Sequence, residues 1–295
     1  MELPEFLTRL KQHEWGSESL ITQFEHSPHL LSKLKKIKGF LIDMDGTLYV
    51  GPHRLTGAYE WMQAMQNRPY LVLTNNSSAD GNRYVDRLNA LEMPTDRSKV
   101  LTSGDASTQW LADHTEYRSP YVLGAKAARD ACLKAGLTPT AYNENPDCVL
   151  LAYDVELTYQ KLSEACLLVT KGLPYFATHA DRTCIVPEGL LPDAGAMIAA
   201  IQTTTGCLPR VLGKPEKPIL DAGLSRLNTS IETTMMIGDQ LDTDIMLGHK
   251  HSLFSVLVLT GETSEAQLAK SEHKPSLVCQ HIGELYTVLK ILNVL

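Results

Sequence analysis

The chain has 295 residues, of which 43% are apolar and 21% are charged, and its formal net charge is -7 at pH 7. This length is enough for about two domains with buried cores, and the composition is that of a folded globular chain rather than a disordered one. The negative charge argues against a nucleic-acid or anionic-membrane partner. No run approaches the roughly 18 apolar residues that a membrane span needs.

Residues 1–15 mix charged and apolar side chains, and they lack the basic start and the apolar stretch of a secretion signal. The six cysteines lie far apart and form no Cys-x-x-Cys pair. This spacing predicts reduced, mostly buried thiols rather than a zinc site or a disulfide framework. We therefore expect a cytoplasmic protein.

Residues 1–36 are predicted to be helical, because Leu7, Leu10, Leu20, Ile21 and Phe24 recur at helical spacings. From residue 39 onward, short apolar runs alternate with amphipathic helices, which is typical of a parallel sheet covered by helices on both faces. The role of the N-terminal extension stays open at this point.

A second segment with the same alternation of strands and helices begins near residue 120. Near residue 209 the pattern of the segment that began at residue 39 returns. We therefore predict an α/β protein with a doubly wound, Rossmann-like parallel sheet in its core domain. The predicted core covers residues 37–118 and 209–295, and an α/β domain of residues 119–208 is inserted into it. Residues 1–36 form a separate helical extension.

Four apolar runs of the expected core sheet end in polar residues. They are GFLI before Asp43 and Asp45, YLVL before Thr74, Asn75 and Asn76, RVLG before Lys214, and TMMIG before Asp239 and Asp244. Ligands bind at the carboxyl ends of the strands in an open parallel sheet. Carboxylates, a lysine, a hydroxyl and amides that are far apart in the sequence are thus expected to meet at one edge.

Several carboxylates at close quarters repel one another, so a cation must compensate their charge. A divalent ion such as Mg2+ suits carboxylate oxygens and keeps water and substrate phosphate among its ligands. Lys214 adds a compact positive donor for a phosphate oxygen. Together these residue types predict a phosphate site.

Asp43 and Asp45 are suited to two different tasks within such a site. The carboxylate of Asp43 can attack phosphorus and form an aspartyl-phosphate, which divides the hydrolysis into two easier transfers. Asp45 can protonate the leaving oxygen and then take a proton from the attacking water. A turn capped by aspartates is the alternative for this pair alone.

Four segments resemble, in the same order, the motifs of the haloacid dehalogenase superfamily, and specifically of its type IIA phosphatases. They are Asp43-Met44-Asp45-Gly46-Thr47, Thr74-Asn75-Asn76, Gly213-Lys214-Pro215, and Gly238-Asp239 with Thr243-Asp244. The resemblance covers residues 38 to 290 and implies a phosphoric monoester hydrolase that uses Mg2+ and acts on a small phosphorylated metabolite. It also implies that the inserted domain is a cap, through which relatives commonly dimerise.

The resemblance further implies a role for each motif residue. The metal site would comprise Asp43, Asp45, Asp239 and Asp244, with Asp45 binding through its backbone carbonyl and Asp244 holding metal-bound water. Asp43 and Asp45 would also be catalytic, as would Lys214, which would neutralise the phosphoryl group that Thr74, Asn75 and Asn76 bind. The cap segment of residues 177–192 would select the leaving group. Within this segment and directly after it, the chain has His179 and Asp193 where relatives often have Asn and Gly. Two roles are open for His179, a substrate contact and a packed polar residue, and we include it among the substrate-binding candidates.

Two other classes of protein fit parts of this pattern. A receiver-like module is phosphorylated on an aspartate without turnover, but such a module is about half as long and has no cap. A binding scaffold built on the same fold would use residues 1–36 to recruit a partner, although the intact motif side chains argue against it. The residues do not name the physiological substrate, because the loops of a cap select it through their shape.

Overall fold

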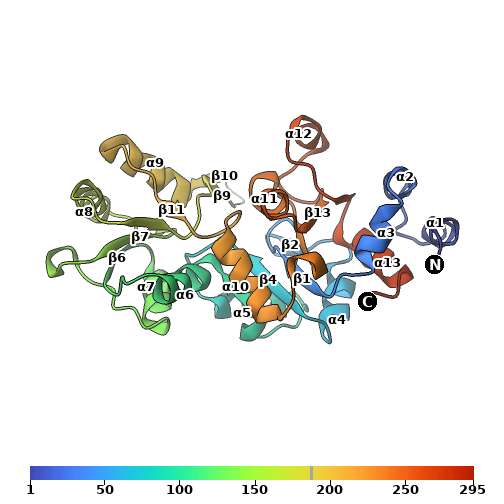
Figure 1. Cartoon of the computed structure of the whole chain (residues 1–295), viewed down its shortest axis with the longest axis horizontal. Helices are drawn as coiled ribbons and strands as arrows, with labels where there is room; N and C mark the ends of the chain where they lie inside the picture. The colour runs from blue at the N-terminus through green and yellow to red at the C-terminus, as the bar shows by residue number, and fades with distance from the viewer. Residues whose placement is uncertain (187–188) are drawn as a thin grey trace. The chain divides into compact units, whose positions relative to one another are not determined.

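The computed structural model describes residues 1–186 and 189–295 and divides into two compact units (Figure 1). The first unit comprises residues 1–73, 85–100 and 223–295, and the second comprises residues 74–84 and 101–222. The parallel α/β architecture predicted from the sequence is confirmed. The predicted domain boundaries stay a prediction.

A six-stranded sheet with the order β14-β13-β12-β1-β4-β5 organises the first unit. Its pairings from β14 to β4 are parallel. The strands are β1 (Gly39–Ile42), β4 (Tyr70–Thr74), β5 (Val100–Thr102), β12 (Thr234–Gly238), β13 (Phe254–Val258) and β14 (Leu277–Cys279). A hairpin of β2 (Tyr49–Val50) and β3 (His53–Arg54) follows β1.

Successive residues of β1 face opposite sides of this sheet, and each side is covered by a helix. The Phe40 ring meets Trp61 of α4 (Ala58–Met65) edge to face, with 5.6 Å between ring centroids. Leu41 faces the other side, where it lies against Gly223 of α10 (Lys217–Leu227). The sheet is therefore doubly wound, as the sequence predicts. The remaining helices of this part are α5 (Gly81–Ala90), α11 (Met246–His251), α12 (Glu265–Lys270) and α13 (Ile282–Ile291).

The N-terminal extension is helical, as predicted, and is packed into the first unit. It forms α1 (Leu3–Lys11), α2 (Glu18–His26) and α3 (His29–Leu34). Phe6 and Phe24 are completely buried and meet edge to face at 4.8 Å between centroids. Helix α1 contacts α13, and α2 contacts the edge strand β14. Burial of such aromatic side chains contributes about 1.5 to 3 kcal/mol each, so the extension belongs to the core of this unit.

The second unit is built on a parallel four-stranded sheet with the order β11-β8-β7-β6. Odd-numbered residues of its strands, such as Leu123 and Leu151, pack with α8 and α9. Even-numbered ones, such as Leu150 and Phe176, pack with α6 and α7. The strands are β6 (Pro120–Leu123), β7 (Cys148–Leu151), β8 (Tyr175–Ala177) and β11 (Arg210–Val211). The helices are α6 (Ser103–His114), α7 (Lys126–Lys134), α8 (Tyr159–Thr170) and α9 (Ala194–Thr205).

The strand before Lys214 differs from expectation. The run RVLG was predicted to join the core sheet, but β11 pairs with β8 in the four-stranded sheet, with Arg210 opposite Phe176. A strand of two residues contains too little pattern to show which of two parallel sheets it joins. An antiparallel pair of β9 (Thr183–Val186) and β10 (Gly189–Pro192), also unpredicted, precedes α9.

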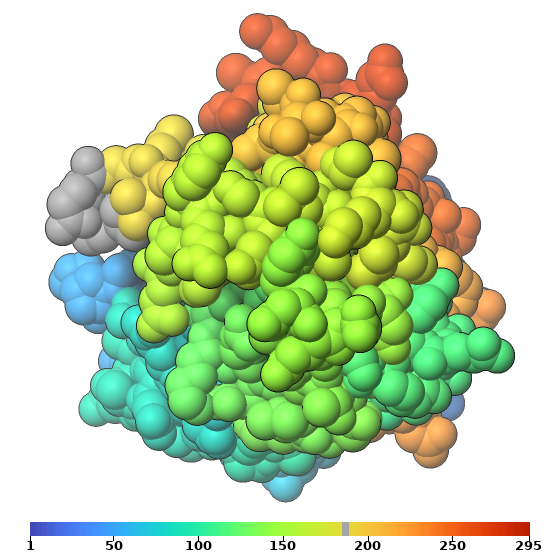
Figure 2. All heavy atoms as spheres, turned by 90° about the vertical axis from the view of Figure 1, so that its left-hand side faces the viewer, coloured from blue at the N-terminus to red at the C-terminus, as the bar shows by residue number. Residues whose placement is uncertain are grey.

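The green and yellow spheres in Figure 2 show one face of the second unit. Large apolar side chains are exposed on α8 and just before it, among them Val155, Tyr159 and Leu167. The homodimer predicted through the inserted domain stays a prediction. Among residues 1–186 and 189–295, no helix has the length and apolar character that crossing a bilayer requires. The six cysteines are free, and four of them are buried, which confirms the prediction of mostly buried thiols. Their reduced state stays a prediction.

Candidate active site

The register of the central strands brings two aspartates to the same edge of the six-stranded sheet. Ile42 of β1 lies opposite Ile237 of β12, and Asp43 donates its backbone N–H to the Ile237 carbonyl at 2.8 Å. Asp239 follows the last residue of β12. Because the two strands are parallel neighbours, their carboxyl ends place both side chains at one edge, as the sequence predicts.

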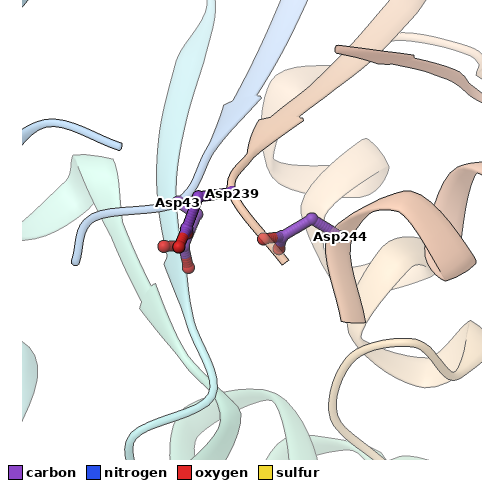
Figure 3. A group of neighbouring side chains, drawn as sticks. All are labelled: Asp43, Asp239 and Asp244. Carbon is purple, nitrogen blue, oxygen red and sulfur yellow. The ribbon is translucent and has the colours of Figure 1, made fainter. Parts of the chain in front are cut away.

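Asp244 joins these two residues to form a cluster. Carboxylate oxygens of Asp43, Asp239 and Asp244 all lie within 4.8 Å of one another, and all three residues are buried. Figure 3 shows the Asp43 and Asp239 carboxylates side by side, with the Asp244 carboxylate turned toward them. Asp244 lies on η4 (Leu241–Ile245), a single π-helical turn that leads into α11. Such turns are frequent at functional sites because they redirect a side chain.

Glycines make the room that this cluster needs. A Cβ at Gly46 or Gly261 would collide with the Asp239 carboxylate, and a Cβ at Gly238 would collide with Asp244. Gly46 also has φ +81°, in the left-handed region that favours glycine. Glu262 donates its backbone N–H to Asp239 Oδ2 at 2.7 Å. The sequence reading did not single out Gly261 or Glu262, since a glycine after a strand is an ordinary turn signal.

Asp45 differs from Asp43 in its surroundings. Asp43 is 9% exposed, whereas Asp45 is open to solvent. The Tyr49 hydroxyl donates to Asp45 Oδ2 at 3.4 Å. A buried carboxylate beside a solvent-accessible one fits a fixed nucleophile and a group that exchanges protons with water.

The donor set of the cluster fits a hard divalent cation. Three carboxylates this close repel one another, and burial adds to the cost of their charge, so a bound cation would stabilise the cluster. Oxygen ligands of this kind suit Mg2+ or Ca2+ rather than a metal that prefers sulfur or nitrogen. Asp43, Asp239 and Asp244 would hold such an ion through their side chains. Asp45 would take part through its backbone, as the resemblance implies.

Asn75 and Lys214 are brought together in the second unit. Asn75 Oδ1 accepts the backbone N–H of Lys214 at 2.9 Å, and Asn75 Nδ2 donates to the Lys214 carbonyl oxygen at 3.1 Å. Both residues are almost fully buried. Thr74, the last residue of β4, accepts the backbone N–H of Asn76 through its hydroxyl oxygen at 3.1 Å. The Asn76 side chain in turn accepts from Ser78. The amide side chains of this motif therefore shape their own loop and hold Lys214.

His179 is completely buried, and both of its ring nitrogens have partners. Nε2 lies 2.9 Å from Asp193 Oδ1, and Nδ1 lies 2.9 Å from the Thr178 hydroxyl. His179 and Asp193 are the two positions at which the sequence departs from the family pattern, and they contact each other. A substrate contact by His179 stays a prediction, but these bonds favour the alternative of a packed polar residue.

The sequence reading assigned no role to a second acid in this region. Asp181 Oδ1 accepts from Asn75 Nδ2 at 2.9 Å. Burial raises the pKa of the Asp181 carboxyl, although the bond from Asn75 and the charge of Lys214 oppose this rise. A contact between residues 106 positions apart leaves no pattern in a single sequence.

Comparisons with known proteins identify relatives over most of the chain. The family models described as Haloacid dehalogenase-like hydrolase and HAD-hydrolase-like match residues 40–138 and 211–285. The 5'-nucleotidase YutF of Bacillus subtilis is 34% identical over 253 residues, which are 85% of this chain and 98% of the relative. The 4-nitrophenylphosphatase of Thermotoga maritima has a similar structure, with TM-score 0.81 and 36% identity over 86% of this chain and 97% of that one.

A third similar protein was solved with a metal. The glycerol phosphate phosphatase Rv1692 of Mycobacterium tuberculosis, in complex with magnesium, has TM-score 0.80 and 28% identity, and the match covers 86% of this chain and 77% of that one. The regions that the two family models match include the aspartate cluster of residues 43, 239 and 244.

Proposed function

The chain belongs to the haloacid dehalogenase-like hydrolases as a type IIA phosphoric monoester hydrolase, and we propose that it removes phosphate from a small phosphorylated metabolite through an aspartyl-phosphate on Asp43. Its relatives are named for nucleotides, 4-nitrophenyl phosphate and glycerol phosphate. The substrate class that we propose is therefore a small phosphomonoester of this kind.

The observation that carries this proposal is the cluster of Asp43, Asp239 and Asp244, whose carboxylate oxygens lie within 4.8 Å of one another in a buried setting. Folding such a cluster is unfavourable without a cation. Three glycines, at positions 46, 238 and 261, leave the space that the carboxylates of this cluster occupy. A cluster built in this way is best explained as a metal site. We propose Mg2+, which would shield the charge of the incoming phosphate when bound.

Each bond change has a residue suited to it. A carboxylate oxygen of Asp43 attacks phosphorus, and the bond from phosphorus to the leaving oxygen breaks as Asp45 donates its proton to that oxygen. A water then attacks the phosphorus of the aspartyl-phosphate, Asp45 accepts the proton of that water, and inorganic phosphate leaves with Asp43 restored. Burial keeps Asp43 fixed for attack, while exposure lets Asp45 exchange its proton with solvent.

We propose that Lys214 neutralises the negative charge of the transferring phosphoryl group. Lys214 is only 3% exposed, and the compact ammonium of a lysine suits a phosphate oxygen. The two hydrogen bonds with Asn75 fix the Lys214 backbone. In this assignment Asn75 contributes by holding Lys214, and Thr74 adds its hydroxyl.

The direct test is turnover of p-nitrophenyl phosphate with Mg2+. The purified chain is expected to release nitrophenol, EDTA is expected to stop the release, and Asp43→Asn is expected to lose at least about 10³-fold in kcat because the nucleophile is gone. Asp113→Asn is the matched control, since Asp113 is exposed on α6, where it accepts a hydrogen bond from Gln109 of the same helix. It should keep wild-type turnover.

A substrate panel then separates the candidates. Nucleotides, sugar phosphates, glycerol phosphate, phosphoglycolate and pyridoxal phosphate are compared by kcat/KM, which measures discrimination between substrates. A chain that turns over neither p-nitrophenyl phosphate nor any member of this panel, with Mg2+ present, would refute the proposal.

A further inference from the structure

A continuous set of hydrogen bonds in the second unit leads from the start of α9 to Lys214. We propose that His179 and Asp193 form a latch that holds Asp181 against Asn75, which makes His179 a positioning residue for Lys214 rather than a substrate contact. This proposal rests on the proposed function, because Lys214 is there assigned to the phosphate.

The first part of the latch is a group of side chains whose hydrogen-bonding groups are all satisfied by one arrangement of protons. Asp193 Oδ1 accepts from Nε2–H of His179 and also from the backbone N–H of Ala194, which caps α9. Nδ1 of His179 then accepts from the Thr178 hydroxyl. Thr178 in turn accepts from Ser77 at 3.0 Å. Since every group is satisfied when Nε2 carries the proton, this tautomer follows from the network.

The backbone joins this network to Asp181. Gly195, in the first turn of α9, donates its N–H to the Asp181 carbonyl at 2.8 Å, and Asp193 donates its N–H to the Arg182 carbonyl at 3.1 Å. A Cβ at Gly195 would collide with the carbonyl of Ala180. The turn that contains Asp181 is thus packed directly against the residues that His179 holds.

The last part of the path is Asn75. Its Nδ2 donates to Asp181 Oδ1 and to the Lys214 carbonyl, so both of its amide hydrogens are used. Its Oδ1 accepts the Lys214 N–H. Asp181 therefore fixes the rotation of the amide that brackets the Lys214 backbone on both sides. Movement of Asp181 would free that amide and loosen Lys214.

A role limited to stability does not explain this arrangement well. Buried ionisable pairs contribute little net stability compared with apolar residues of the same volume, yet His179 and Asp193 are 0% and 4% exposed. The pair instead provides conformational specificity, because its hydrogen bonds hold the turn of residues 178–182 in one conformation. Such specificity is useful where that geometry determines the position of Lys214.

The experiment measures phosphate affinity and turnover in the full chain. His179→Leu removes both ring bonds, and Asp193→Ser keeps a helix cap but is too short to reach His179. Both are expected to raise KM for p-nitrophenyl phosphate, and the calorimetric Kd of inorganic phosphate, by about tenfold, with a smaller change in kcat. His179→Gln keeps a donor toward Asp193 and should stay within about threefold of wild type. In an Asp181→Ala background, His179→Leu should add less than about twofold, because the path is already broken.

Tyr121→Phe is the control for a purely structural loss. Tyr121 is buried in the same unit, and the partners of its hydroxyl are Glu164 at 2.8 Å and the Lys161 carbonyl at 3.2 Å. It should lower Tm and leave KM and the phosphate Kd unchanged. The latch is overturned if His179→Leu and Asp193→Ser behave like Tyr121→Phe. A wild-type chain that binds phosphate without turnover contradicts the proposed function, and the Kd comparison then decides on the latch by itself. A wild-type chain that does neither overturns both.

Discussion

The side chain of Gln23 forms two hydrogen bonds with the backbone of Val278, both 2.9 Å long. Its Nε2 donates to the Val278 carbonyl oxygen, and its Oε1 accepts the Val278 N–H. Val278 lies on β14, the edge strand of the six-stranded sheet. An open edge offers unpaired backbone groups to other chains. The side chain of Gln23, in the N-terminal extension, thus pairs both backbone groups of one residue of this strand, as a neighbouring strand would.

We predict that Gln23→Leu lowers the free energy of unfolding by about 1 to 3 kcal/mol, because it leaves the two backbone groups of Val278 without these partners. Urea unfolding measures the change. Gln109→Leu is the matched control, since Gln109 is exposed and its amide donates to Asp113 on its own helix. An unfolding midpoint of Gln23→Leu equal to that of the control would contradict the role of Gln23.

The second prediction concerns the space beside Asp239. Gly261→Ala would place a Cβ against the Asp239 carboxylate, which Glu262 also fixes through its backbone. We expect a loss of about 10²-fold in kcat/KM, since a displacement of about 1 Å in a catalytic group has this effect. The concentration of Mg2+ for half-maximal rate should rise as well. Gly104→Ala is the control, because a Cβ there meets nothing closer than 3.6 Å. If Gly261→Ala needed the same Mg2+ concentration for half-maximal rate as the wild type, a role of Asp239 in metal binding would be contradicted.

The third prediction is a pH dependence of stability that originates at Asp181. Burial raises the pKa of this carboxyl above its ordinary value of 3.8. The folded chain therefore binds more protons than the unfolded chain between the ordinary and the raised pKa, so stability falls as pH rises through this window and does not return above it. Asp181→Asn keeps an acceptor for Asn75 and removes the titration. We expect a flatter plot of unfolding free energy against pH from about pH 4 to neutrality, and parallel plots for both chains would refute the assignment.

Much of the first unit could be predicted because its rules are local. An apolar run followed by an aspartate shows a buried strand and its carboxyl end, and parallel strands then bring Asp43 and Asp239 to one edge. The position of α4 in this unit, and those of α8 and α9 in the second unit, follow from helical spacing in the same way. These features depend on neighbours in the sequence, so one chain is enough to read them.

The contacts between distant residues could not be predicted. Gln23 and Val278 are 255 positions apart, and Asn75 and Lys214 are 139 apart. An amide side chain has no periodic pattern that reveals its partner. The unusual residues at 179 and 193 did mark a departure, but only the structure shows that they contact each other. The sequence could flag such positions without giving their geometry.

The last prediction tests the acid role of Asp45, which is exposed beside the buried Asp43 and accepts from the Tyr49 hydroxyl. Glycerol phosphate has a poor leaving group that needs a proton, so Asp45→Asn should lower kcat/KM for it by about 10² to 10⁴-fold. Nitrophenolate leaves without a proton, so the variant should still transfer phosphate from p-nitrophenyl phosphate to Asp43. Because Asn cannot then activate water, stopped-flow absorbance should show a burst of nitrophenol equal to the enzyme concentration, followed by slow turnover. Tyr49→Phe keeps both carboxylates and should retain turnover within a few-fold, as the control. Equal losses for the two substrates, without a burst, would exclude Asp45 as the proton donor.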